Sequence, residues 1–385
     1  MNRYLQKVLS LLAVIIPIGI FAQIPSKGDS TNLEIANWNI EWFGKTGSGY
    51  GPDNEALQRK NILRTVRETK IDLWALCEIS DINAFDTLTD SLPEYGSAIC
   101  NYLPEQKTGL LYNKTMFELL DSRLLATANK DSFSTGRFPF LVILKPLFKT
   151  SIDTLFVIVV HLKANYGTNT EKLAAYNSRI RSAEWLQMFL SSNMKNRYCI
   201  VAGDWNDDID ESIYNALPTP YAKLRDNTAG FTFLSKQLTD NHIATTTGYP
   251  EAIDHQYASA RLSSLRLNNF TSIINLTPYI TSYASTTSDH FPVYSVFSFK
   301  TSRLHTTATL NPVLYPNPAL HSVTVKGLPE GPNNITLYNA CGECVWTIET
   351  PADHTIMLDD FAPGFYRISI RNFAGVFNSP LMIVR

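Results

Sequence analysis

Apolar and polar residues follow two different spacings in the first 300 positions of the chain. Leu33–Trp38 alternates apolar and polar residues, which predicts a strand because neighbouring strand side chains point to opposite faces. Glu55–Thr69 carries apolar residues at helical spacing, and Glu171–Leu190 is the longest helix candidate. Further apolar runs predict strands at Leu73–Leu76, Gly109–Tyr112, Phe140–Leu147, Leu155–Val160, Cys199–Ala202, Ile253–Ala258 and Val293–Phe299. This interleaving predicts one large layered α/β domain at residues 31–300.

The C-terminal part of the chain has a different pattern. After a Thr-rich linker at residues 301–310, short β-type runs recur between turn residues. These runs lie at Ser322–Val325, Ile335–Tyr338, Cys344–Ile348, Thr355–Leu358, Phe365–Ile370 and Leu381–Val384. Their length and spacing predict a small all-β sandwich at residues 311–385.

The N-terminus predicts export. Arg3 and Lys7 precede the apolar run Val8–Ile20, and the small residue Ala22 stands where a signal peptide of residues 1–22 would be cleaved. The alternative is a membrane anchor, which the short length of the run disfavours. No other segment is apolar enough to cross a bilayer, so we expect no stable membrane span.

Composition limits what the chain can do. With 44% hydrophobic residues it can bury a sizeable core. Lys and Arg total 33 against 35 for Asp and Glu, so the bulk charge indicates no polyanionic partner. Any function that involves nucleic acid must therefore depend on a local site.

Polar residues that can bind a metal ion, transfer a proton or contact a phosphate lie where the predicted strands end or begin. They are Asn39, Glu41, Glu78, His161, Lys163, Asp204, Asn206, Asp254, Asp289 and His290. Carboxylate and carboxamide oxygens are the ligands that Mg²⁺ and Mn²⁺ prefer, and histidine moves protons near neutral pH. Cleavage of a phosphodiester needs charge neutralisation, an activated water and help for the leaving group, and these side chains supply all three.

The order and spacing of these residues resemble the endonuclease/exonuclease/phosphatase superfamily, in particular its deoxyribonuclease-like members, over residues 31–300. The resemblance implies a four-layer α/β/β/α sandwich. It also implies a metal site at Asn39, Glu78 and Asp289. Glu41 occupies a position where some relatives place a second metal-binding carboxylate and others do not.

The same resemblance implies roles for the other residues. Asp204 would orient or deprotonate the attacking water, and strand alternation would place Asn206 beside it to hold the phosphate. His290 would contact the phosphate with Asp254 as its buried partner, and His161 would assist the leaving group. Arg137 and Lys163 are substrate-binding candidates, whereas Asp207, Asp208 and Asp210 are interpreted as solvated loop charges.

Three separated segments of the C-terminal part resemble the sorting domain of type IX secretion cargo. They are Val313–Ala319, Leu337–Asn339 with Gly342, and Phe361–Tyr366. The resemblance implies a secreted or cell-surface protein that the type IX secretion machinery recognises. The alternative is an ordinary carbohydrate- or protein-binding sandwich.

Together these features predict a secreted, monomeric phosphodiesterase that depends on Mg²⁺ or Mn²⁺, with Ca²⁺ as a further candidate. DNA or RNA is the expected substrate. A phosphatase or a phospholipid phosphodiesterase of the same superfamily is an alternative. The segment around Asp254 lacks the Trp-Cys signature of inositol-phosphate phosphatases, and no aromatic hairpin suited to membrane insertion is evident. An alternative that is not an enzyme is a surface adhesin on the same scaffold. This alternative predicts that some of the site residues are missing from the sequence.

Overall fold

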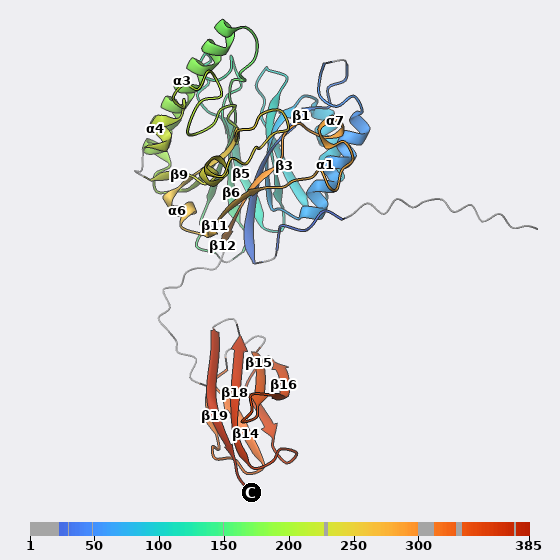
Figure 1. Cartoon of the computed structure of the whole chain (residues 1–385), viewed down its shortest axis with the longest axis vertical. Helices are drawn as coiled ribbons and strands as arrows, with labels where there is room; N and C mark the ends of the chain where they lie inside the picture. The colour runs from blue at the N-terminus through green and yellow to red at the C-terminus, as the bar shows by residue number, and fades with distance from the viewer. Residues whose placement is uncertain are drawn as a thin grey trace, which may run out of the picture. The chain divides into compact units, whose positions relative to one another are not determined.

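The computed structural model describes residues 23–29, 31–47, 49–148, 150–226, 230–298, 312–328, 333–372 and 375–385. The chain divides into two compact units, Met1–Thr301 and Ser302–Arg385 (Figure 1). The predicted signal peptide at residues 1–22 and the predicted linker at residues 301–310 lie outside the described residues.

The first unit contains two six-stranded sheets. In spatial order, the first sheet consists of β11 (Arg266–Ile273), β12 (Val293–Ser298), β1 (Asn32–Phe43), β2 (Leu73–Ile79), β4 (Lys107–Asn113) and β3 (Tyr95–Ile99). The second sheet consists of β5 (Phe117–Leu124), β6 (Phe140–Pro146), β7 (Leu155–His161), β8 (Tyr198–Asp204), β10 (Asp254–Ser259) and β9 (Phe231–Phe233).

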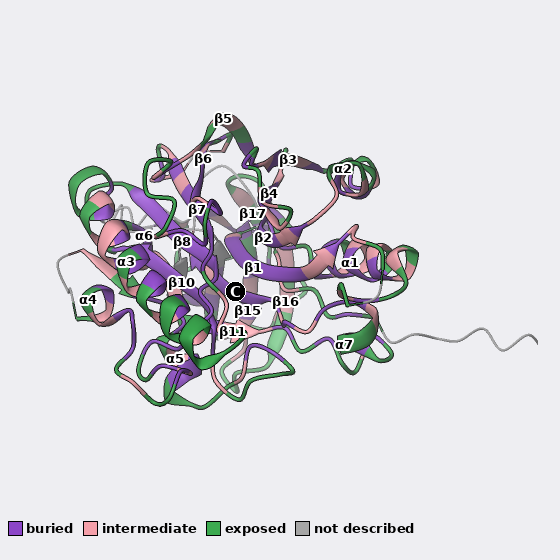
Figure 2. Cartoon of the chain, turned by 90° about the horizontal axis from the view of Figure 1, so that it is seen from above, coloured by how far each residue is buried: buried purple, intermediate pink, exposed green. Residues whose placement is uncertain are grey.

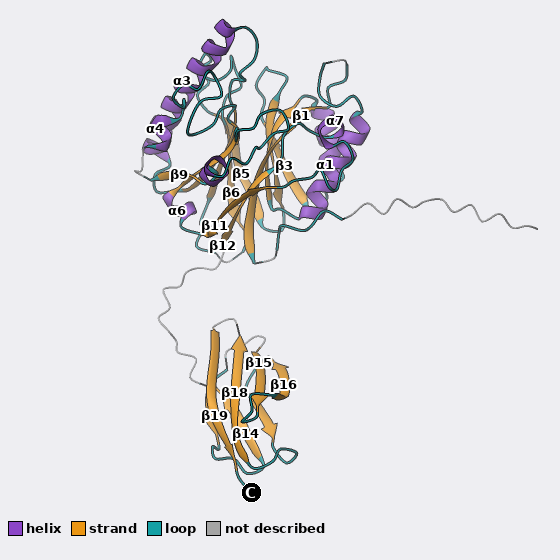
Figure 3. Ribbon diagram, viewed as in Figure 1, coloured by secondary structure: helices purple, strands orange, loops and turns teal. Residues whose placement is uncertain are grey.

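The helices cover the outer faces of the two sheets, as Figure 3 shows. The described helices are α1 (Glu55–Thr69), α2 (Ile82–Asp90), α3 (Asn169–Asn193), α4 (Ala222–Arg225), α5 (Lys236–Asp240), α6 (Ala260–Ser263) and α7 (Tyr283–Thr286). The predicted helix at Glu55–Thr69 is confirmed, and the second predicted helix extends three residues beyond Leu190. A capping box between Thr168 and Glu171 begins that longer helix, α3.

Three apolar layers hold the first unit together. One lies between the sheets and includes Ile35, Val157 and Ile200. A second joins α1 and α2 to the first sheet, and a third joins α3 and α4 to the second sheet. Figure 2 shows the central strands buried beneath partly exposed helices. Each sheet is thus covered on both faces, which confirms the predicted four-layer α/β/β/α sandwich.

The two sheets share one pairing pattern that places four strand ends together. At the centre of each sheet lies a parallel pair, β1 with β2 and β7 with β8, and antiparallel strands flank both pairs. Parallel strands end at the same edge of a sheet. Beneath that edge the sheets are joined by the buried Asn37 side chain, whose Nδ2 donates to Gly203 O at 3.1 Å. Side chains at the four carboxyl ends therefore meet.

The second unit is all β, as predicted. Its three-stranded sheet consists of β13 (Val313–Tyr315), β14 (Ser322–Lys326) and β17 (His354–Met357). Its four-stranded sheet consists of β16 (Cys344–Thr350), β15 (Asn333–Tyr338), β18 (Gly364–Asn372) and β19 (Gly375–Ile383). Ala319, Val323, Ile335 and Ile368 belong to its own apolar core. Among the described residues of the whole chain, no helix is long and apolar enough to span a membrane.

Candidate active site

Asn39 joins the two sheets at the centre of the candidate site. Its Nδ2 donates to Glu78 Oε1 at 3.1 Å and to Asp204 Oδ2 at 3.0 Å. Glu78 lies near the end of β2, Asp204 ends β8, and Asn39 lies near the end of β1. Three predicted site residues are therefore in direct contact, although 165 positions separate Asn39 from Asp204.

Unusual backbone conformations shape this edge of the first sheet. Glu41, Trp42 and Glu78 have positive φ angles of 44°, 49° and 65°. The pairing of β1 with β2 shifts register between Asn39 and Phe43, in the same region. The distortion points the Trp42 N–H at Glu78 Oε2, at 3.0 Å. Strained backbone of this kind persists where the surroundings hold it, and it is common at functional sites.

A second acidic pair lies beside Glu78. Glu41 Oε2 accepts a hydrogen bond of 2.9 Å from the Asp289 N–H, so the loop before β12 is attached to the end of β1. Burial, followed by the negative charges of Asp289 and Glu78, raises the pKa of Glu41 to about 8. Carboxylates held this close repel one another in the absence of a cation.

The types of donor atom at this edge suit a divalent cation. Glu41, Glu78, Asp289 and Asn39 offer oxygen ligands, which magnesium and manganese favour. Ligand atoms of Glu78, His161 and Asp204 lie within 4.8 Å of one another, and so do those of Asp204, Asp254 and His290. A bound cation would offset the repulsion among the carboxylates.

His290 is held by a buried carboxylate. Its Nδ1 lies 2.8 Å from Asp254 Oδ2, and the same oxygen accepts from Thr245 Oγ1 at 2.8 Å. Its Nε2 lies 4.0 Å from Asp204 Oδ2 and 3.8 Å from Asp289 Oδ1. Burial opposes protonation, but the carboxylates around the ring, led by Asp254, outweigh it and raise the pKa of His290 well above its ordinary value.

His161 has the opposite electrostatic environment. It is buried, its Nε2 lies 3.4 Å from Asp204 Oδ2, and the Nη1 of Arg137 lies 2.8 Å from each ring nitrogen. Burial, followed by the charge of Arg137, lowers the pKa of His161 well below its ordinary value. The two histidines flank Asp204 but favour different protonation states.

Asp204 and Asn206 are held together by a turn. Burial raises the pKa of Asp204 to about 7. The Asn206 N–H donates to Asp204 Oδ1 at 2.9 Å, and Asn206 Nδ2 donates to Leu162 O at 3.2 Å. Strand alternation does not place this pair, contrary to the prediction, because β8 ends at Asp204 and Asn206 has a φ of 58°.

Comparison with known families identifies this arrangement. Residues 36–290 match the Endonuclease/Exonuclease/phosphatase family. The chain belongs to this family. Residues 313–383 match a secretion system C-terminal sorting domain, so both resemblances predicted from the sequence are confirmed. The protein is accordingly a secreted or cell-surface cargo of type IX secretion. No curated protein matches the chain.

Several solved structures share the fold. D. rerio TDP2 complexed with single strand DNA product has 18% identity and a TM-score of 0.52 over 70% of this chain and 100% of that one. An endonuclease/exonuclease/phosphatase from Bacteroides vulgatus has 17% identity and a TM-score of 0.51, with the same coverage. The human Nocturnin catalytic domain with bound sulfate anion has 17% identity and a TM-score of 0.50 over 70% and 94% of the two chains.

Members of the Endonuclease/Exonuclease/phosphatase family hydrolyse phosphate ester bonds, and they generally use divalent metals. In this member, nine of the eleven predicted site residues converge on the edge where β1, β2, β7 and β8 end. The two substrate-binding candidates lie beside this group, because Arg137 contacts His161 and Lys163 follows that histidine by two residues. Arg137 is 8% exposed and donates to Gln106 Oε1 and Leu162 O, and Lys163 is exposed on the wall of a neighbouring cavity.

Two of the three supposed loop charges are buried, which corrects the prediction. Asp207 is fully buried, and its Oδ2 accepts from Arg179 Nε at 3.0 Å and Nη2 at 2.8 Å. Asp208 accepts from Thr239 Oγ1 and the Ala252 N–H. A local sequence rich in Asp is typical of a polar loop, and only the packing of α3 and of residues near β10 reveals buried partners.

Sequence reasoning also missed residues that position the site. Thr245 holds Asp254, and Ser288 Oγ donates to Asn39 O at 2.7 Å while accepting from the His290 N–H. Trp38 Nε1 donates to His290 O at 3.0 Å. Hydroxyl residues in loops are common, so the sequence around Thr245 contains no signal that separates it from its neighbours.

Proposed function

We propose that this protein is a secreted phosphodiesterase that requires Mg²⁺ or Mn²⁺ and cleaves strands of DNA or RNA. One observation carries the proposal: Asn39 links Glu78 and Asp204 across the two sheets, beside the Asp254–His290 pair. This combination offers oxygen ligands, a carboxylate near a reacting water and a protonated imidazole within one small volume.

Asn39, Glu41, Glu78 and Asp289 would hold the cation. The bound metal supplies electrostatic stabilisation of the charge that develops on the phosphate. Asn39 has a second function, because its amide fixes the distance between Glu78 and Asp204. Ca²⁺ remains a further candidate, since oxygen ligands also suit it.

Asp204 would orient the attacking water and accept its proton. Its raised pKa makes it a better base than an exposed aspartate, and Asn206 is held beside it to contact the phosphate. His290, kept protonated by its carboxylate neighbours, would donate to a phosphate oxygen. His161 would act near the leaving group.

Several observations favour a nucleic acid over other phosphoesters. D. rerio TDP2, a structural neighbour, was solved with a single strand DNA product. Arg137 and Lys163 lie at one side of the proposed metal site. The adhesin alternative predicts missing site residues, whereas the polar groups retain mutual contacts that a noncatalytic scaffold does not need.

The first test removes the metal. Hydrolysis of a single-stranded oligonucleotide should stop after chelation and return with Mg²⁺ or Mn²⁺. Glu78→Gln should lower kcat by at least about a hundredfold with little change in Tm. Glu184→Gln, on the exposed face of α3, is the matched control and should behave as the unaltered protein. Undiminished cleavage after exhaustive chelation would exclude the proposed mechanism.

The second test compares substrates under one set of conditions. Rates on oligonucleotides, sphingomyelin and inositol phosphates are measured with the same metal and salt. We expect the oligonucleotide to be cleaved fastest. Preferential turnover of the lipid or the inositol phosphate would leave the metal-dependent chemistry in place and contradict the nuclease assignment.

A further inference from the structure

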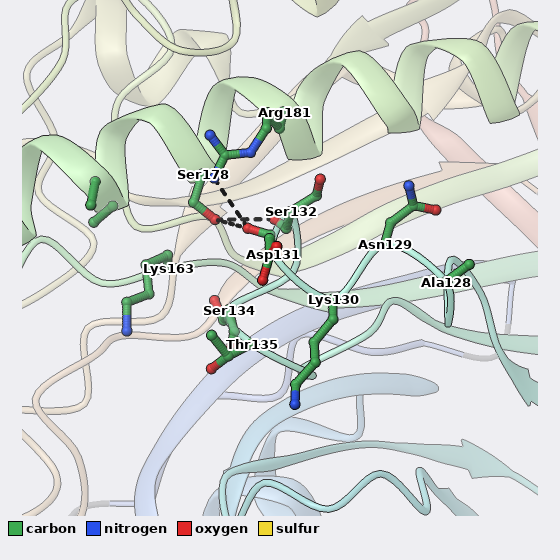
Figure 4. Close-up of a pocket in the computed structure, with 12 residues that line it drawn as sticks. Ala128, Asn129, Lys130, Asp131, Ser132, Ser134, Thr135, Lys163, Ser178 and Arg181 are labelled. Carbon is green, nitrogen blue, oxygen red and sulfur yellow. Dashed lines mark hydrogen bonds between the residues drawn. The ribbon is translucent and has the colours of Figure 1, made fainter.

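We propose that a cavity beside the active site binds a second, non-reacting phosphate of the nucleic acid strand being cleaved. The inference rests on the proposed function and specifies how its substrate is held. The cavity has a volume of about 680 Å³ and lies between the loop before β6 and the N-terminal half of α3 (Figure 4). Lys130, Lys163, Ser134 and Thr135 line it, with Ser178 and Arg181 of α3.

The lining is cationic although the chain is not. Lys130, Lys163 and Arg181 contribute three positive charges, and Asp131 contributes one negative charge. The formal net charge of the whole chain is −2, so this local excess of cations is a departure from the rest of the molecule. Figure 4 shows Lys130 and Lys163 on either side of the turn at Ser134 and Thr135. Both lysines line the same cavity, so an anion bound in it would be attracted by both ammonium groups.

Helix α3 holds the loop that forms this cavity. Ser178 Oγ lies 3.1 Å from Asp131 O and 3.2 Å from Ser132 O, and Arg181 Nη2 donates to Asp131 O at 3.2 Å. Ser134 and Thr135 have positive φ angles of 48° and 58°. Two successive strained residues cost about 1–3 kcal/mol each, a conformation that proteins retain chiefly at ligand-binding and active sites.

The cavity adjoins the reacting groups. Ser134 Oγ accepts from Arg137 Nη2 at 3.3 Å, and Arg137 Nη1 contacts His161. Lys163 follows the same histidine by two residues, and its carbonyl accepts from Arg179 of α3. One side chain therefore separates the wall of the cavity from the active site, so a single extended ligand can occupy both.

The chemistry of the lining selects a phosphate. Among the described residues that line the cavity there is no aromatic side chain on which a base could stack. Ammonium groups and hydroxyls instead recognise the backbone, which has the same structure in every sequence. We infer that the cavity raises the affinity for oligonucleotides over substrates with one phosphodiester, with little selectivity among bases.

The test uses the full chain with Lys130→Ala, which leaves the substrate-binding candidate Lys163 in place. The matched control is Lys223→Ala, an exposed lysine that is paired with a surface carboxylate and is absent from the cavity lining. The substrates are a short single-stranded oligonucleotide and bis(4-nitrophenyl) phosphate, which has a single phosphodiester. The cavity variant should show a decrease of about tenfold in kcat/KM on the oligonucleotide and of less than about twofold on the small diester. The control should match the unaltered protein on both substrates.

Binding is measured separately from cleavage by fluorescence anisotropy of a labelled oligonucleotide. The cavity variant should bind more weakly, and the slope of log Kd against log salt should fall by roughly 0.7 for each phosphate that its side chains no longer neutralise. Unchanged oligonucleotide binding, or equal decreases in kcat/KM on both substrates, would overturn the subsite. Absence of cleavage by the unaltered protein, together with lysine-dependent binding, would instead contradict only the proposed function. Binding of inositol hexakisphosphate is measured in the same way. If the substitution weakens binding of this compound but not of the oligonucleotide, the subsite for a nucleic acid phosphate is also overturned.

Discussion

At the level of single residues, His290 shows how neighbours define chemistry. The residue is 7% exposed, and burial alone would favour the neutral form of its ring. Asp254 reverses that preference at a distance of 2.8 Å and fixes Nδ1, which leaves Nε2 directed toward Asp204 and Asp289. Thr245 in turn holds the carboxylate of Asp254. The charge and orientation of His290 thus depend on two further side chains, Asp254 and Thr245.

This dependence predicts similar effects for two substitutions. His290→Ala and Asp254→Asn should each lower kcat by about a hundredfold or more, because an unheld imidazole neither keeps its proton nor presents the right nitrogen. Steady-state kinetics on an oligonucleotide, with circular dichroism to verify folding, provides the measurement.

The second unit offers a matched control. His321 and Asp359 form a pair of the same type at 2.9 Å, but their side chains are 73% and 60% exposed. His321→Ala and Asp359→Asn should leave kcat unchanged. Near-normal rates in a folded His290→Ala protein would remove this histidine from the catalytic residues.

At the level of elements, α3 is attached to two loops that follow site strands. Arg179 forms a buried ion pair with Asp207 after β8 and donates through Nη1 to the carbonyl of Lys163 after β7. Ser212 Oγ and the Ile213 N–H also donate to Asp207. One helical residue therefore fixes the two strand ends that bear His161 and Asp204.

Removing this arginine should destabilise the fold strongly. Arg179→Met leaves the buried Asp207 without its cation, so the free energy of unfolding should fall by about 3–5 kcal/mol. Urea unfolding provides the measurement. Lys223→Met is the control, because it breaks an exposed pair with Glu184 of the same helix and should cost roughly 0–1 kcal/mol. Equal destabilisation of the two variants would contradict this account.

The opposite end of β1 predicts a dependence of stability on pH. Burial, followed by the charge of Asp72, raises the pKa of Glu34 to about 9, and burial raises that of Asp72 to about 6. A carboxyl group with a raised pKa in the folded state contributes stability below its unfolded pKa and loses it as pH rises toward the folded value. The free energy of unfolding should therefore fall as the pH rises from the ordinary carboxyl pKa to about 9.

Glu34→Gln tests this expectation. The variant cannot ionise, so its free energy of unfolding should decline less between mildly acidic and alkaline pH than that of the unaltered protein. Glu118→Gln, whose side chain is 53% exposed, is the control and should preserve the original slope. Identical pH profiles for Glu34→Gln and the unaltered protein would contradict the prediction.

At the level of the whole molecule, the two units have separate cores. All proposed site residues lie before Ser298, and the second unit buries its own apolar residues. A truncated protein that ends at Ser298 should keep its kcat and KM in a hydrolysis assay but fail to reach the cell surface or the medium in its native host. An inactive but well-folded truncation would indicate that the sandwich binds substrate.

Local pattern and motif chemistry were sufficient to predict the layered fold, the all-β tail and the residues at the strand ends. Alternation of apolar and polar residues identifies a strand. The residue at the end of that strand can then be read from the sequence, even though the residues that it contacts in space are unknown. The order of Asn39, Glu78, Asp204 and His290 supported the resemblance to the family for the same reason, because the order and spacing of a motif are visible in the sequence itself.

Only the tertiary structure decided which of these residues touch, and which charges are buried. Periodicity shows that a face is covered but not what covers it, so the contact of Asn39 with both Glu78 and Asp204 required two packed sheets. The burial of Asp207 depends on Arg179, which is 28 positions away. The cationic cavity likewise combines a loop with a helix. Long-range packing sets these electrostatic environments, because the field at a side chain depends on its neighbours in space rather than in sequence.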